Sequence, residues 1–133
     1  MKKTKIYYLD PSSSSRALEM EHEENDIQWI YDLLGIDTFD IVDRVIGGKV
    51  YSFVVDDEGL FKPNLPVASC KDYNEVLFGK IFICKHDEEG EMISLTDDDI
   101  KNIEANITNT RGQIIFIKNK ITASNMILNY SLR

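Results

Sequence analysis

Several stretches of the chain alternate apolar and polar residues with a period of two, which is typical of half-buried β-strands. The pattern predicts strands over residues 5–9, 39–46, 49–55, 76–85, 114–117 and 126–132, with a short return over 92–95. Tyr7 and Tyr8 are expected on opposite faces of the first strand. In the second, Phe39, Ile41 and Val45 are expected on the buried face.

Glycine-bearing turns punctuate the middle of the chain. Gly47-Gly48 and the segment 56–59 are turn signals between strands, so residues 39–61 are predicted to form an antiparallel meander. The prolines at 63 and 66 cannot continue a central strand, because each lacks a backbone donor. Residues 16–26 are polar and are expected to be a loop or a frayed helical turn.

Two helices interrupt the strands. The first is predicted over residues 26–34, with Asn25 as N-cap, Gln28 completing a capping box and Gly35 ending the helix. The second begins after Thr96, whose hydroxyl can cap the helix. The apolar stripes are Ile27, Ile30, Tyr31 and Leu34 on the first helix, and Ile100, Ile103 and Ile107 on the second.

These elements predict one α+β domain over residues 1–133, with a mostly antiparallel sheet of about five to seven strands and two helices packed on it. The composition, 43% hydrophobic, fits a globular chain. No apolar run approaches the ~20 residues of a membrane helix, and no signal-peptide core follows the basic start. We therefore expect a cytoplasmic protein. Cys84 is expected in the core and Cys70 in a polar loop, both as thiols, and the alternative is a disulfide between them.

The net charge of −8 is unevenly distributed. Residues 19–100 carry 21 acidic and six basic side chains, a net of −15, whereas both ends of the chain are net basic. Direct nucleic-acid binding needs a basic footprint, so this charge argues against it. An acidic body repels anionic membranes and can attract a basic protein surface, although acidic surfaces often serve solubility alone.

The residues do not indicate catalysis. His22 and His86 have no second strong ligand at helical spacing, and the cysteines form no CxxC pair, so neither a metal nor another cofactor is predicted. Gly47-Gly48-Lys49 lacks the spacing of a phosphate-binding loop. A Cys70–His86 dyad can be drawn but has little support. Tyr51, Phe53 and Phe61 could stack on bases, yet core packing accounts for them better.

Several of these features resemble domain-of-unknown-function family 3846. They are the helix at 27–34, the Gly47-Gly48 turn, the VVDDEGLFKPNLP segment, the strand at 76–83 with Gly79, and Ser94-Leu95-Thr96-Asp97 opening a helix. They cover a core of residues 25–107 and leave 108–133 as a C-terminal strand extension. The resemblance implies a small protein of phages, plasmids or other mobile elements of Firmicutes. It implies no activity for any residue.

Two functions remain open. The first is a non-enzymatic binding protein, such as a host-defence inhibitor that blocks a basic nucleic-acid-binding surface. Its contacts would be the acidic residues of two turns: Asp56, Asp57, Glu58, Asp87, Glu88, Glu89 and Glu91. The second is small-molecule or nucleotide binding near Asn64, Pro66 and Gly79, or an accessory domain without catalytic activity. The oligomeric state is not predicted.

Overall fold

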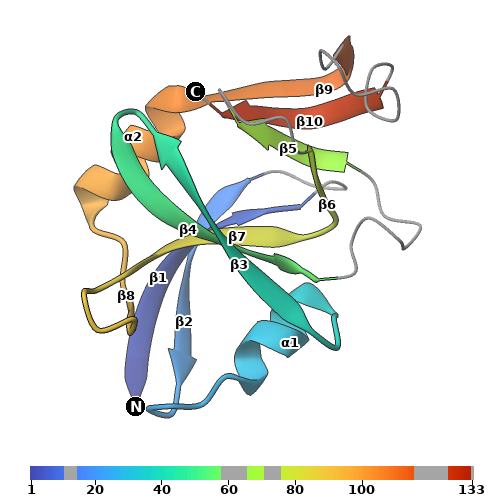
Figure 1. The fold of residues 1–133 in the computed structure, drawn as a ribbon. Coiled ribbons are helices and arrows are strands. Elements are labelled where there is room, and N and C mark those ends of the chain that lie inside the picture. The colour runs from blue at the N-terminus through green and yellow to red at the C-terminus, as the bar shows by residue number, and fades with distance from the viewer. Residues whose placement is uncertain (11–14, 58–65, 71–75, 116–125, 133) are drawn as a thin grey trace.

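The computed structural model describes residues 1–10, 15–57, 66–70, 76–115 and 126–132. Its main feature is a six-stranded antiparallel sheet in the order β2-β1-β7-β4-β3, with β8 paired to β7 (Figure 1). The strands are β1 (Lys2–Leu9), β2 (Arg16–His22), β3 (Phe39–Ile46), β4 (Lys49–Asp56), β7 (Ile81–His86) and β8 (Met92–Ile93). The prediction of a single α+β domain with two helices is confirmed.

A second, four-stranded sheet was not predicted. It has the order β6-β5-β10-β9 and contains β5 (Pro66–Cys70), β6 (Val76–Phe78), β9 (Ile107–Ile115) and β10 (Met126–Leu132). Figure 1 shows it above the larger sheet. β5 pairs with β10 in parallel, and the other pairs are antiparallel. Pro66 is the first residue of β5, where a strand tolerates proline.

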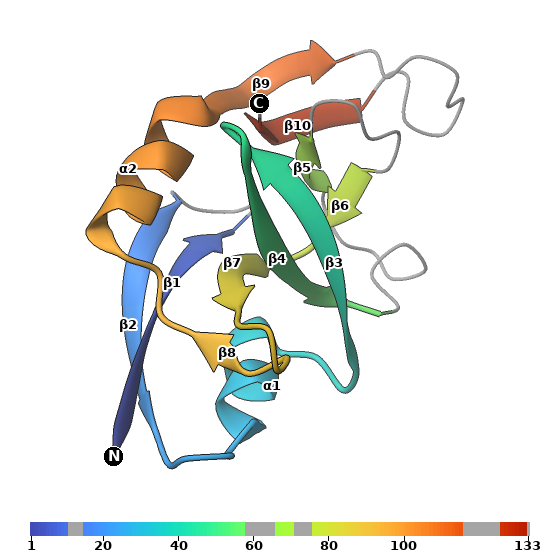
Figure 2. The same ribbon diagram turned by 60° about the vertical axis from the view of Figure 1, so that its left-hand side comes forward.

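Each helix covers one face of the larger sheet. α1 (Gln28–Leu34) contributes to a core that we call the α1-side core, and α2 (Asp97–Asn106) to the α2-side core. Tyr7 belongs to the α2-side core and Tyr8 to the α1-side core, as their adjacent positions in a strand require. Figure 2 shows that α2 runs directly into β9.

The start of α1 differs from the prediction. Asn25 has a left-handed backbone (φ 66°) and does not cap the helix, which begins at Gln28. Asp26 instead accepts a hydrogen bond from the Gln28 N–H at 2.9 Å. Ile27 therefore precedes the helix and is 52% exposed, whereas Trp29 is buried. Gly35 ends the helix as predicted, with φ 65°.

The segment predicted as a loop or helical turn is strand β2. Leu18 and Met20 are half-buried against the α1-side core, while Glu19 and Glu21 are exposed. This alternation is strand periodicity, and β2 pairs with β1 along its whole length. The prediction of a loop or helical turn was wrong, because the glutamates hide the alternation of apolar residues in this segment.

The expected buried face of β3 is right at Phe39, which packs against the α1-side core, and wrong at Ile41 and Val45. Ile46 is buried and Val42 packs on the α2-side core, whereas Ile41 and Val45 are 41% and 42% exposed. The predicted hairpin itself is confirmed, since β3 pairs with β4 around the Gly47-Gly48 turn. The third strand of the predicted meander, at residues 60–61, lies outside the described residues.

The apolar run 76–85 is two strands rather than one. β6 lies in the small sheet and β7 in the large one, and Gly79, with φ 79°, lies between them. Cys70 ends strand β5 rather than lying in a loop, and Cys84 is a buried free thiol as predicted. The expected strand at 114–117 is the end of the longer β9, as far as residue 115.

Candidate functional site

The turn between β7 and β8 is the best-defined acidic feature of the described surface. Asp87 organises it: its carboxylate accepts hydrogen bonds from the backbone N–H groups of Glu89 and Glu91, each at 2.9 Å. The Gly90 N–H donates to the Asp87 carbonyl, and the Asp87 N–H donates to the Glu91 carbonyl. The backbone of this turn is therefore held by its own first residue.

Three carboxylates project from this turn. Glu88, Glu89 and Glu91 are exposed, and within the described part of the chain none of them forms an ion pair. Because no cation of the described segments pairs with them, their charges are available to a basic group on another molecule. We call Asp87, Glu88, Glu89 and Glu91 the acidic turn.

The other predicted acidic residues are elsewhere. Because β4 and β7 are antiparallel, Asp56 lies beside the start of β7, while the acidic turn follows its end. The six residues of β7 span about 20 Å at about 3.3 Å per residue. Asp56 is only 8% exposed, which does not suit contact with a partner, whereas Asp57 is exposed. Glu58 lies outside the described residues.

The predicted ligand corner is only partly described. Pro66 is opposite Phe78 in the β5–β6 pair, which places it close to Gly79. Gly79 is buried and has a positive φ, so its described role is to turn the chain between the sheets. Asn64 lies outside the described residues.

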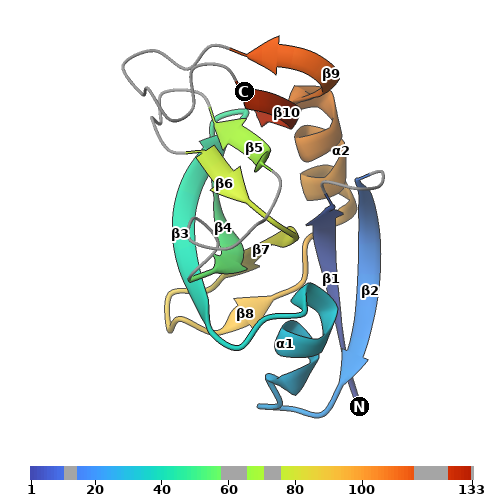
Figure 3. The same ribbon diagram turned by 90° about the vertical axis from the view of Figure 1, so that its right-hand side faces the viewer.

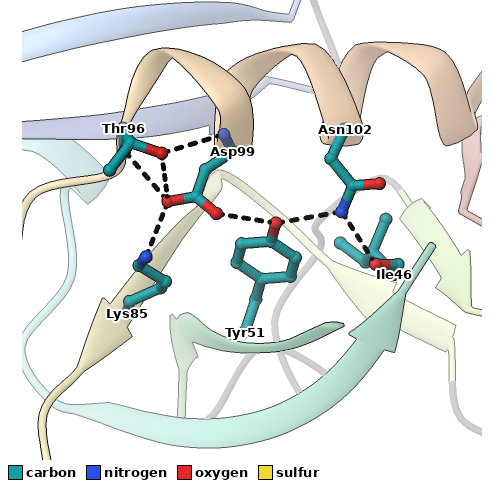
Figure 4. A network of polar contacts seen from close by, with 6 residues as sticks. All are labelled: Ile46, Tyr51, Lys85, Thr96, Asp99 and Asn102. Carbon is teal, nitrogen blue, oxygen red and sulfur yellow. Dashed lines mark hydrogen bonds and ion pairs between the residues drawn. The ribbon is translucent and has the colours of Figure 1, made fainter. Parts of the chain in front are cut away.

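A polar network that the sequence analysis missed joins α2 to the larger sheet (Figure 4). The Asp99 carboxylate lies 2.7 Å from the Lys85 ammonium and accepts a hydrogen bond from the Tyr51 hydroxyl at 3.0 Å. Thr96 caps the helix and donates to Asp99 through both its N–H and its hydroxyl, each at 2.9 Å. Asn102 donates to the Tyr51 hydroxyl. We call these five residues the Asp99 network.

Asp99 is unsuited to general acid–base catalysis. Burial alone would raise the pKa of its carboxyl, but the hydrogen bonds from Lys85, Thr96 and Tyr51 outweigh it and lower the pKa to about 2. Burial also raises the pKa of Tyr51. A carboxylate this acidic stays ionised near neutral pH and is a poor proton acceptor. The Asp99 network therefore positions α2, and its members come from segments far apart in sequence.

A second polar chain lies on the opposite face of the sheet. The Ser52 hydroxyl donates to Asp43 at 3.1 Å, and His86 Nδ1 lies 2.9 Å from the same hydroxyl. Since serine has one proton and gives it to Asp43, His86 must donate to Ser52. In a catalytic triad the serine donates to histidine and the aspartate contacts histidine. This order is different, so the contacts do not activate Ser52 as a nucleophile.

The described residues contain no group of three or more side chains that could hold a metal ion. His22 is instead occupied in packing and hydrogen bonding: it stacks on Trp29 at 5.1 Å and its Nε2 lies 2.8 Å from the Thr4 hydroxyl. None of the described helices has the length and apolar character needed to cross a bilayer.

The fold and these sites define a small α+β protein with a charged surface turn and an internal polar network. Residues 1–108 match the family described as Domain of unknown function (DUF3846), and the chain belongs to that family. The match includes β1 and β2, which the resemblance noted in the sequence had left outside. A search of the curated proteins and a search of the solved structures each gave no match.

Proposed function

We propose that this chain is a non-enzymatic binding protein whose acidic turn engages a basic surface of a partner protein. The observation that carries the proposal is the backbone-organised turn whose three exposed glutamates have no ion pair among the described residues. Preformed geometry lowers the entropic cost of binding, and unpaired carboxylates favour a cationic partner. No covalent step is part of this proposal.

The finer proposal is an inhibitor of host defence encoded by a phage or other mobile element and acting in the bacterial cytoplasm. Proteins that bind nucleic acid present basic grooves, and a rigid set of carboxylates can compete for such a groove as phosphates do. The acidic middle of the chain, a net charge of −15 over residues 19–100, supports this proposal and disfavours direct contact with nucleic acid.

The test is affinity capture from a Firmicutes host extract at low and high salt. The test variant carries Glu88→Lys, Glu89→Lys and Glu91→Lys. The matched control carries Glu19→Lys, Glu23→Lys and Glu24→Lys, three other exposed positions with the same change in net charge. We expect a basic partner that the wild type and the control retain at low salt and that the test variant loses. Equal capture by all three proteins would refute the role of the acidic turn.

A second proposal is small-molecule binding near Pro66 and Gly79, favoured by their proximity at the junction between the two sheets. Thermal denaturation with a panel of nucleotides and second messengers tests it. A ligand present at 100 times its Kd should add about 2.7 kcal/mol of stability. The absence of a shift across the panel would count against this function.

A further inference from the structure

Strand β3 forms one edge of the larger sheet, and Figure 3 shows it along the outer margin. Among the described residues it pairs only with β4. The Ile46–Lys49 pair closes a two-residue turn whose glycines both have positive φ. The closing pair of such a turn is hydrogen-bonded, and along an antiparallel ladder hydrogen-bonded pairs alternate with non-hydrogen-bonded pairs. The pairs that β4 forms with Ile41, Asp43 and Val45 are therefore non-hydrogen-bonded. Ile41, Asp43 and Val45 therefore direct their backbone polar groups away from β4.

Two side-chain contacts agree with this direction. The Ile41 N–H donates to the Asp40 carboxylate at 2.8 Å, and the Asp43 carbonyl accepts from the Arg44 guanidinium at 2.8 Å. The Ile41 N–H has a single proton, so its bond to Asp40 leaves none for β4, and the Asp43 carbonyl contact is consistent with the same outward direction. Asp40 and Arg44 thus cover part of an edge that would otherwise invite pairing.

The side chains beside this edge form a pattern. Ile41 and Val45 are 41% and 42% exposed, and Val50, opposite Val45 on β4, is 62% exposed. The exposed Asp43 lies between Ile41 and Val45 on the same face of the strand. The edge therefore presents an apolar–acidic–apolar row together with outward-directed backbone groups.

We propose that the β3 edge binds an extended segment of a partner protein by strand addition. The segment would carry apolar, basic and apolar residues at alternate positions, with its Lys or Arg opposite Asp43. Backbone hydrogen bonds would supply affinity and the alternate side chains selectivity. On binding, the segment would displace the Asp40 and Arg44 contacts. This inference goes beyond the proposed function, because β3 contains none of the acidic turn.

A second copy of this chain fits the edge less well. Antiparallel pairing of two β3 strands centred on Asp43 would place Ile41 opposite Val45, but the two Asp43 carboxylates opposite each other. Like charges directly opposite are destabilising, whereas a basic residue at that position is favourable. Charge complementarity therefore selects a foreign, basic segment.

The first experiment titrates the isotope-labelled full chain with two blocked peptides, Thr-Val-Thr-Lys-Thr-Val-Thr and the same peptide with Glu in place of Lys. We expect amide shifts centred on Ile41, Asp43 and Val45, and at least tenfold tighter binding of the Lys peptide. Equal affinity for the two peptides, shifts centred elsewhere, or no binding at millimolar peptide would overturn the proposal.

Variants of β3 make the test specific. Val45→Pro removes one outward N–H at an edge position where proline is tolerated, and Val45→Thr is the matched control that keeps it. We expect at least tenfold weaker peptide binding for the proline variant alone. Asp43→Lys should reverse the preference, so that the Glu peptide binds more tightly than the Lys peptide. This second variant keeps the test decisive if Val45→Pro does not fold. An unchanged preference, or a dimer of the wild type with protected Ile41 and Val45 amides, would overturn the proposal.

Discussion

The carboxylate of Asp99, at the N-terminus of α2, lies 2.7 Å from the ammonium of Lys85 on β7. The Asp99 side chain is 3% exposed and the Lys85 side chain 28%. This ion pair fixes the start of the helix over the sheet, and it bridges the local cap at Thr96 to the buried Tyr51. Its energetic role can be tested directly.

Replacing Lys85 with Met should destabilise the protein. The change leaves a buried carboxylate without its cation, a loss of about 3–5 kcal/mol for a fully buried pair. Because the Lys85 side chain is 28% exposed and water can reach the site, we expect about 2 kcal/mol. Urea unfolding measures the difference. Lys80→Met, at an exposed lysine, is the control, and an equal loss in both variants would contradict the role of the pair.

Stability should fall with acid in a way that depends on Asp99. The folded-state pKa of about 2 lies below the ordinary value of 3.8. The contribution of this carboxylate is therefore fully present above about pH 4 and is lost as the pH falls toward 2. We expect a loss of about 2 kcal/mol. Urea unfolding at several pH values should show that Asp99→Asn, already weaker at pH 7, loses less stability in this range. An identical pH dependence would show that other groups control it.

Tyr51→Phe should cost about 1–2 kcal/mol, because the hydroxyl is buried and its loss leaves Asp99 with one donor fewer. The interaction is tested by a double-mutant cycle with Lys85→Met, which should show a coupling of at least about 0.5 kcal/mol. Tyr31→Phe is the control, since the Tyr31 hydroxyl has no hydrogen bond among the described residues. Strict additivity would mean that Tyr51 and Lys85 act independently.

Features encoded by neighbouring residues were predictable. Gly47-Gly48 between two strands predicts a tight hairpin from local sequence alone, and β3 and β4 form it. Thr96 followed three residues later by Asp99 has the spacing of a capping box, and the two residues form one. The alternation of Leu18 and Met20 was also visible. Such isolated, glutamate-rich alternation is weak evidence for a strand, because β2 is specified by its pairing with β1.

Features that depend on tertiary placement were not predictable. Tyr51 and Asp99 are 48 positions apart and meet only because α2 packs over β4 and β7. Likewise, the sequence shows Ile41 and Val45 as apolar residues at alternate positions of a strand, which would place them on one face. Which set of alternate side chains is covered depends on where the helices pack. Helix α2 covers the face of β3 that carries Val42 and Ile46. The acidic turn could be recognised as a local motif in the sequence. Its separation from Asp57 follows only from the register of β4 against β7.

Gly47→Ala should destabilise more than Gly48→Ala. Both glycines have positive φ, which costs about 1–2 kcal/mol for another residue. Only at Gly47 would a Cβ meet the amides of Asn102 and Asn106, while the space at Gly48 is open. Displacing Asn102 would also break its hydrogen bonds to Tyr51 and to the Ile46 carbonyl. Thermal unfolding of the two variants gives the comparison, and equal losses would show that the asparagines move aside freely.

Cys84 should be unreactive in the folded protein. Burial, with a smaller contribution from the Asp43 charge, raises the pKa of its thiol to about 12. Because the thiolate is the nucleophile, very little reactive species is present at pH 8, and the side chain is also inaccessible. In a Cys70→Ser background, we expect alkylation by iodoacetamide at pH 8 to be at least about 100-fold slower than in urea. The Cys84→Ser variant serves as the reagent control. Rapid alkylation under native conditions would mean that β7 opens readily, which would also weaken the case for a rigid acidic turn at its end.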